Sequence, residues 1–468
     1  MQQQAVFDFV SGFWDKEILP SLQEYIRIPN KSPMFDPEWQ RHGYMDDAVQ
    51  HVMRWVDAQA PGLRMSRHQL EGRTPVLYLT LPGTGDDTVL IYGHLDKQPE
   101  FTGWYDDLDP WTPVLKQDRL YGRGGADDGY AIYSAIAAIK ALQAQNLDMP
   151  RIAIIIECSE ESGSPDLLYY MDALEQDIAG TSLVIALDSS CGNYDQLWMT
   201  TSLRGMLLGE LTVSVLEQGA HSGAAGGIVP SSFQILRHLI SRLEDANTGA
   251  ITPPFLNVQI PLMRYEEAAA AGKVLAKTFS TMFTYDGDCQ PINDDPTELV
   301  LNNSWRASLE VTGVDGIPSL QNAGNVLRPS TAVKLALRIP PTTNAETAAH
   351  ELTRLLTHSP PYGSKVTFEL EVPNPGWHAP LTEDSLEQSF QKASTAFFGA
   401  PAMSMGCGGS IPFMEFLAQK LTDAQFMVTG VLGPHSNAHG PNEFLHIPMA
   451  KKLTACIAQV IHDRVCES

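Results

Sequence analysis

The chain has 468 residues, of which 43% are hydrophobic and 18% charged, a composition typical of a globular protein with a sizeable core. Its 31 Lys and Arg against 55 Asp and Glu residues give a formal net charge of −24. Such an acidic surface repels phosphate backbones and anionic lipids, so we expect neither nucleic-acid nor membrane binding. The acidity alone does not identify a substrate.

The cysteines and the N-terminus restrict the class further. The six Cys residues include no Cys-x-x-Cys pair, which argues against a disulfide framework and against a thiolate zinc site. The first ten residues lack the basic and apolar regions of a secretory signal, and apolar runs such as 131–141 are too short to span a bilayer. We therefore expect a cytoplasmic protein.

Short apolar strands alternate with helices in the first part of the chain. Strands are predicted at 76–81, 88–92, 151–157 and 183–187, and a long helix at 127–145. The last two strands are continuous apolar runs, typical of strands buried on both faces. This order predicts an α/β domain with a mixed, largely parallel sheet flanked by helices.

The pattern changes near residue 200. A long edge-type strand is expected at 203–216, a helix at 231–245, and an irregular segment at 251–300. Strands and helices then segregate in an α+β pattern until an α/β texture resumes after Gly376. The simplest architecture is one α/β domain formed by residues 1–200 and 376–468, interrupted by an inserted α+β domain at 201–375.

Five loops at the ends of predicted core strands carry side chains that can bind a metal. These side chains are His94 with Asp96, Asp127 with Asp128, Glu160 with Glu161, Asp188, and His435 with His439. Ligands of open α/β sheets gather at the carboxyl ends of the strands. Imidazole and carboxylate ligands without thiolate suit zinc, manganese or cobalt. Two His and three carboxylates exceed a mononuclear catalytic zinc site and fit two metals that share one carboxylate and clamp a bridging hydroxide.

Each loop alone has a simpler structural explanation. His94 and Asp96 could form a hydrogen-bonded loop pair, Asp127 could favour a helix N-terminus, and Glu160 could lie in a solvated turn. Asp188 is the stronger signal, because an unpaired carboxylate at the end of an apolar strand is costly. The occurrence of all five loops at one sheet edge favours the metal site.

Four segments carry a family resemblance. They read Tyr92-Gly-His94-Leu-Asp96, Gly122-Arg-Gly-Gly-Ala-Asp127-Asp128, Glu160-Glu161-Ser-Gly-Ser164 and Asn437-Ala-His439-Gly-Pro-Asn-Glu443. Together they resemble the carnosinase-like dipeptidases, within the aminoacylase, desuccinylase and exopeptidase family of dinuclear zinc hydrolases. The resemblance extends over nearly the whole chain, from about residue 22 to the closing helix.

The resemblance implies two divalent metal ions per chain, zinc in the first place, with manganese or cobalt as alternatives. Asp127 would bridge the two ions. His94 and Asp188 would complete one site, and Glu161 and His439 the other.

The resemblance also implies the reaction, the hydrolysis of a peptide bond in dipeptides or short peptides. Asp96 would orient the imidazole of His94, and Glu160 would be the general base. An N-acyl-amino-acid deacylase using the same machinery is the alternative. A non-catalytic scaffold is disfavoured, because all five ligands and the base are present.

The inserted segment matches further family positions. His221, in a glycine-rich loop, resembles the His that reaches the partner subunit's active site and stabilises the oxyanion, which implies a homodimer formed through an inserted lid and dimerisation domain. Asn325 and Arg338 match two substrate-binding positions. Gly409 and Ser410 match a turn that holds the substrate's carboxylate. The alternatives are a flexible loop for His221 and an ordinary salt bridge for Arg338.

The sequence departs from the family pattern at two places. Gly406 and Cys407 stand where relatives commonly have Arg-Glu, which removes two charges near the carboxylate pocket and weakens any statement about the substrate. His378 lies near the place of a further substrate His in relatives, and a functional and a structural role are equally open for it.

Overall fold

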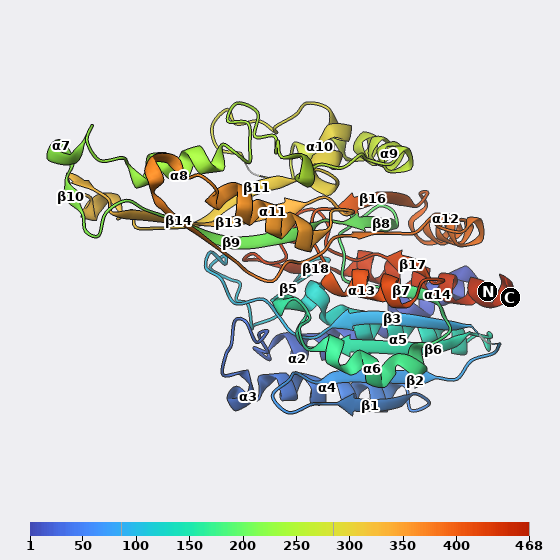
Figure 1. Cartoon of the computed structure of the whole chain (residues 1–468). Helices are drawn as coiled ribbons and strands as arrows, with labels where there is room; N and C mark the ends of the chain where they lie inside the picture. Colours follow the sequence, from blue (N-terminus) through green and yellow to red (C-terminus); the bar gives the residue numbers. More distant parts are fainter. Residues whose placement is uncertain (86, 284, 468) are drawn as a thin grey trace.

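The computed structural model describes residues 1–85, 87–283 and 285–467 (Figure 1). Its main sheet has six strands in the order β1-β2-β6-β3-β7-β17. The strands are β1 (Arg64–His68), β2 (Val76–Leu81), β6 (Arg151–Glu157), β3 (Thr88–His94), β7 (Thr181–Ala186) and β17 (Gln425–Val428). The four strands from β6 to β17 are parallel to one another. At the other edge, β2 pairs antiparallel with β6, and β1 pairs antiparallel with β2. The expected mixed, largely parallel sheet is confirmed.

Helices cover both faces of this sheet because its strands are apolar on both sides. In β2, Leu77 and Leu79 belong to one hydrophobic cluster, and Val76 and Tyr78 belong to another. The first cluster lies under α1 (Gln3–Phe13), α2 (Leu19–Ile26), α4 (Tyr44–Gln59), α5 (Tyr130–Gln143), α12 (Asp384–Phe398) and α14 (Ile447–Glu467). The second lies under α6 (Leu167–Ile178) and α13 (Pro412–Lys420). The strands from β6 to β17 therefore form the central layer of the main core.

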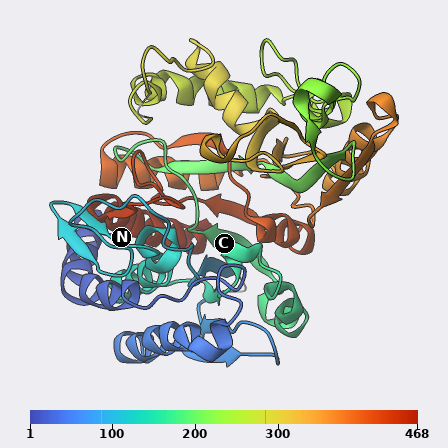
Figure 2. The same ribbon diagram turned by 90° about the vertical axis from the view of Figure 1, so that its left-hand side faces the viewer.

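A separate antiparallel sheet forms a second layer, at the top of both views (Figures 1 and 2). Its order is β11-β13-β9-β14, with β11 (Ser308–Asp315), β13 (Ser330–Ile339), β9 (Gly205–Ser214) and β14 (Lys365–Leu370). One face packs on α8 (Ser232–Ile240) and α11 (Ala345–Thr357) in a third hydrophobic cluster. The prediction that residues 203–216 form an edge strand is wrong, because β9, the strand formed there, lies between β13 and β14. Alternating burial is the same for an edge and an inner strand of a one-sided sheet.

The segment 251–300, expected to be irregular, contains α9 (Leu262–Phe279) and begins α10 (Pro296–Ser304). The prediction of an irregular segment is wrong here, because it gave weight to the flanking Pro and Asp residues and overlooked a helix rich in Ala, Glu and Lys, which are strong helix formers. Buried residues of both helices, such as Leu275 and Leu301, join the main core rather than the cluster under the small sheet. A three-stranded sheet, β15-β8-β16, lies beside them, formed by β15 (Trp377–His378), β8 (Trp198–Leu203) and β16 (Met403–Cys407).

The helix expected from residue 127 starts later. Residues Gly125–Gly129 form a wider turn, and α5 begins at Tyr130, so Asp127 and Asp128 precede the helix. Two small pairings complete the fold: β4 (Val114–Lys116), β5 (Arg119–Tyr121) and β18 (Phe444–His446) form one sheet, and β10 (Ala220–His221) and β12 (Val326–Leu327) form a ribbon. That ribbon and α7 (Ser222–Ala225) lie at the far end of the small sheet (Figure 1). Among the described residues, no helix is both long and apolar enough to cross a membrane.

Candidate metal centre

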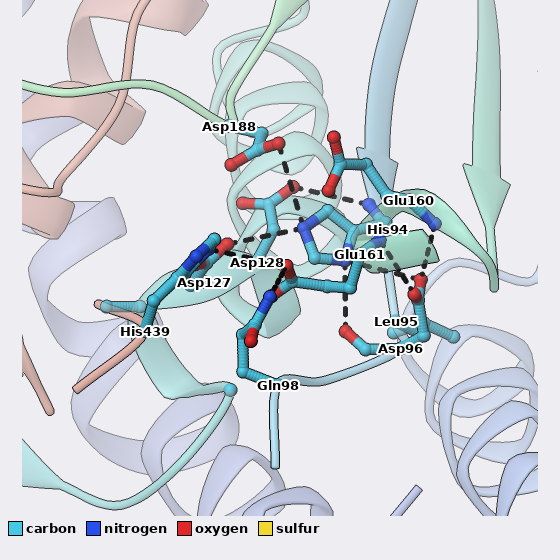
Figure 3. A network of polar contacts seen from close by, with 12 residues as sticks. His94, Leu95, Asp96, Gln98, Asp127, Asp128, Glu160, Glu161, Asp188 and His439 are labelled. Carbon is cyan, nitrogen blue, oxygen red and sulfur yellow. Dashed lines mark hydrogen bonds and ion pairs between the residues drawn. The ribbon is translucent and has the colours of Figure 1, made fainter. Parts of the chain in front are cut away.

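The five side chains predicted as metal ligands gather at the carboxyl ends of the parallel strands (Figure 3). His94 is the last residue of β3, and its Nε2 lies 3.3 Å from Oδ1 of Asp127 and 3.7 Å from Oδ2 of Asp188. His439 Nε2 lies 3.1 Å from Oδ2 of Asp127 and 3.3 Å from Oε2 of Glu161. The residues thus form two groups that share Asp127, and within each group the donor atoms lie within 4.8 Å of one another.

The hydrogen bonds of His94 indicate what these groups can hold. Its Nδ1 lies 3.0 Å from the main-chain oxygen of Asp96 and donates to it, so Nε2 carries the lone pair in the neutral ring. His94 Nε2, Asp127 Oδ2 and Glu161 Oε1 are buried and have no hydrogen-bond partner among the described residues. Lone pairs that face one another in this way are costly unless a cation lies between them. The donor set therefore fits two divalent cations.

The crowding of carboxylates also indicates a cation site. Burial, with the charge of Asp127 adding to it, raises the pKa of Glu161 to about 8, and burial raises the pKa of Asp188 to about 7. Burial opposes the charged form of His439, but Glu161 and Asp127 outweigh it and raise the pKa of His439 to about 10. Without cations the cluster holds protons, which metal ions would displace on binding.

Asp96 contacts both the ring of His94 and the turn that carries Glu160 and Glu161. Its carboxylate accepts the main-chain N–H groups of Glu160 and Glu161, each at 3.0 Å. The carboxylate oxygen Oδ1 lies 3.5 Å from His94 Nδ1, whereas the main-chain oxygen of Asp96 makes the shorter contact with that atom. His94 Nδ1 therefore faces both the carbonyl and the carboxylate of Asp96, and the same carboxylate also fixes the turn Glu160–Ser162.

Two further residues contact the cluster: Asp128, named among the metal-capable side chains but not as a ligand, and Gln98, which the sequence analysis did not single out. Asp128 is buried, and its Oδ2 accepts the main-chain N–H of His94 at 3.3 Å. Gln98 donates from Nε2 to Oε2 of Glu161. Their closeness in sequence to Asp127 and Asp96 was the only available signal.

A buried ion pair joins the loop of Asp127 to the loop of His439. Arg123 Nη1 lies 2.7 Å from Oε2 of Glu443, and Arg123 Nη2 donates to the carbonyl of Gly440 at 2.6 Å. Glu443 Oε1 accepts the N–H groups of Gly124 and Ala126 at 3.0 and 3.3 Å. Both residues lie in the segments that carry the resemblance, but no sequence pattern indicates that they pair.

The cluster opens into a cavity of about 290 Å³. Glu160 lines it beside the candidate ligands, and burial, reinforced by the charge of Asp188, raises the pKa of Glu160 well above its usual value. Arg338, Gly409 and Ser410 line it too, and Arg338 Nη1 lies 3.3 Å from the hydroxyl of Ser410. Three of the four residues predicted to bind substrate therefore share one cavity with the candidate metal centre.

The other predicted residues lie elsewhere. His221 is exposed at the end of the β10–β12 ribbon, where the N–H of the following residue donates to the carbonyl of Asn325 at 2.9 Å. Neither of these two residues is among the described residues that line the cavity. His378 also lies outside it. Its Nε2 accepts from Nε of Arg264 at 3.0 Å, and burial together with Arg264 lowers the pKa of His378 to about 4.

The comparisons with known proteins agree with this geometry. The model of Peptidase family M20/M25/M40 matches residues 90–463. The cysteinylglycine-S-conjugate dipeptidase of Corynebacterium striatum is 26% identical over 421 residues, which cover 86% of this chain and 89% of that protein. The beta-Ala-His dipeptidase of Homo sapiens is 24% identical over 456 residues, covering 94% and 88%.

Solved structures show the same fold. The dipeptidase Dug1p of Saccharomyces cerevisiae superimposes with a TM-score of 0.78 at 20% identity, covering 100% of this chain and 99% of that one. Human carnosine dipeptidase 1 gives a TM-score of 0.75 at 20% identity, covering 99% and 98%. The expected resemblance to dinuclear dipeptidases is confirmed. The chain belongs to Peptidase family M20/M25/M40 and is a metallopeptidase of that family, with two candidate ligand groups that share Asp127.

Proposed function

We propose that this protein is a dipeptidase that hydrolyses the peptide bond of small dipeptides. One observation carries the proposal: residues of both ligand groups that share Asp127 line the same cavity as Glu160 and Arg338. The cavity, of about 290 Å³, suits a small ligand and not a folded protein chain. The dipeptidases among the relatives support the same substrate class.

The candidate ligands would hold two divalent cations, most simply zinc. His94 and Asp188 would bind one ion, Glu161 and His439 the other, and Asp127 both. When bound, such ions polarise a carbonyl and lower the pKa of water. Glu160, which lines the cavity, would take the proton of the attacking water and return it to the leaving amine.

The opposite wall would bind the substrate's carboxylate. Arg338 offers a guanidinium that can fork onto two carboxylate oxygens, and Ser410 offers a hydroxyl 3.3 Å from it. Gly409, next to Ser410, lines the same cavity. A free C-terminal carboxylate would then place the scissile bond towards the metal centre.

The test uses metal-stripped protein, with and without added zinc or manganese, on a panel of dipeptides and N-acyl-amino acids. We expect metal-dependent cleavage of dipeptides that falls at least about 100-fold in Glu160→Gln while metal binding persists. Glu371→Gln makes the same change at an exposed ion pair and should leave activity intact. If the protein cleaved only N-acyl-amino acids, it would be an N-acyl-amino-acid deacylase and not a dipeptidase. Absence of metal binding would refute the site.

We also propose a homodimer, formed through an inserted domain of residues 201–375, in which His221 completes the partner subunit's site. The exposed position of His221, outside its own chain's cavity, supports this. His221→Ala and Glu160→Gln would each be inactive alone. When the two variants are dissociated, combined in equal amounts and reassociated, half of the dimers contain one subunit of each variant. Each such dimer has one intact site of two, so about one quarter of the wild-type activity should return. No recovery despite verified mixed dimers would refute the exchange.

A further inference from the structure

A second cavity, called here the side pocket, adjoins the catalytic cavity. It has a volume of about 160 Å³ and lies between the end of α9, the middle and end of α10, and β16. Ser190, Cys407 and Leu432 line both cavities, so the two adjoin at these residues. Anything bound at the metal centre therefore has the side pocket next to it.

The walls of the side pocket are mainly apolar, with Ser190, Thr278 and Asn303 as the uncharged polar residues among the described lining residues. Leu275, Phe279 and Met282 come from α9 and the turn that follows it, Val300 comes from α10, and Met405 comes from β16. None of the described residues that line the side pocket is charged. The catalytic cavity differs sharply, because its walls carry four carboxylates, an imidazole and a guanidinium. Such a space favours an apolar group and disfavours a charged one.

The boundary between the cavities is fixed by local contacts. The Cys407 sulfur lies 3.5 Å from the N–H of Gly409 and 3.5 Å from the hydroxyl of Ser190. Gly409 belongs to the proposed carboxylate wall, and Ser190 lies two residues beyond the candidate ligand Asp188. A dipeptide held between that wall and the metal centre would thus lie against the mouth of the side pocket.

We propose that the side pocket receives the apolar side chain of one residue of the substrate, so that dipeptides with a leucine or methionine side chain are preferred over glycine and over charged residues. This inference rests on the proposed dipeptidase function and deepens it. Cys407, at the mouth, and Met282, on the far wall, are then residues that determine specificity.

The test measures kcat/KM of the zinc-loaded protein for Gly-Gly, Leu-Gly, Gly-Leu, Asp-Gly and Gly-Asp. A methylene in an apolar enzyme pocket is worth about 10-fold or more in discrimination, so a leucine dipeptide should exceed Gly-Gly at least about 10-fold in one of the two orders. Thr278→Phe, which fills the side pocket from α9, should remove that preference and leave Gly-Gly turnover unchanged. Val274→Phe introduces the same ring on α9 at an exposed position outside the side pocket and should behave like the wild type.

A second variant distinguishes loss of the side pocket from a local packing defect caused by Thr278→Phe. Met282→Asp puts a carboxylate on the side-pocket wall and should lower kcat/KM for the preferred leucine dipeptide at least about 10-fold relative to Gly-Gly. Equal turnover of all dipeptides, or equal losses for Gly-Gly and the leucine dipeptide in both variants, would overturn the side pocket and leave the dipeptidase function standing. No turnover of any dipeptide by the wild type would overturn both.

Discussion

The pairing of Arg123 with Glu443 predicts a specific and measurable coupling between stability and metal binding. The pair is fully enclosed, with 1% of the Arg123 side chain and 0% of the Glu443 side chain exposed. Glu443→Gln keeps an oxygen for the N–H groups of Gly124 and Ala126 but removes the negative charge. Arg123 then remains as an uncompensated buried cation close to a second one, Lys97.

The expected loss of folding stability in Glu443→Gln follows from the burial of the ion pair. Breaking a buried ion pair by removing one partner costs about 3–5 kcal/mol, whereas an exposed pair contributes about 1 kcal/mol or less. Glu371→Gln is the matched control, because Glu371 pairs with Lys334 at the same 2.7 Å with both side chains about half exposed. Urea unfolding of the metal-free proteins compares the two variants. Equal free energies of unfolding for both would refute the argument from burial.

The same substitution should act unequally on the two metal ions. Glu443 fixes the loop of His439, and removing a group that supports a metal ligand commonly costs about 10–100-fold in metal affinity. His94 and Asp188 do not contact this pair. Because Glu443 also accepts N–H groups from the loop of Asp127, which both groups share, zinc titration against a competing chelator should show both sites affected and the site of His439 weakened more. Equal weakening of both sites would show that the pair does not act through the His439 loop.

Three further predictions follow from the site. Asp127→Asn should abolish tight binding of both zinc ions, while Asp188→Asn should spare one, as metal analysis after dialysis would show; equal stoichiometry would contradict a shared ligand. Arg338→Lys should raise KM for a dipeptide about 10-fold or more and leave a C-terminally amidated dipeptide unaffected, since only the former has a carboxylate to bind. His378 has a pKa of about 4 in the folded chain and an ordinary value of 6.5, so the free energy of unfolding should fall as pH drops from about 6.5 towards 4. His378→Gln should flatten that dependence, and an unchanged slope would contradict it.

The loops of His94, Glu161 and Asp188 could be placed from the sequence because each follows a strand that is easy to recognise, whereas the assignment of five ligands to two sites was implied by the family resemblance. The strands ending at His94 and shortly before Asp188 are continuous apolar runs, and parallel strands bring their carboxyl ends to one edge of the sheet. The order of these loops along the chain therefore carried most of the geometry of the site.

Other features depend on pairings that no local pattern contains. Arg123 and Glu443 are 320 residues apart, and nothing in either segment indicates that they meet. The inner position of β9 depends on β14, a strand that follows it by some 150 residues. The side pocket exists because α9 packs on the main core, and α9 was hidden by the Pro and Asp residues that flank it.

The contacts around the cluster explain how so many carboxylates can be held close together. Asp96 accepts two N–H groups from the turn of Glu160, and Glu443 accepts two from the loop of Asp127. None of these bonds uses a side-chain atom that could bind metal in the two candidate ligand groups. The loops are therefore fixed by carboxylates that do not bind metal, and the donor atoms need little rearrangement to meet a cation. Because a site that is already arranged loses less conformational freedom on binding, the energy of metal binding goes into affinity and not into ordering the loops.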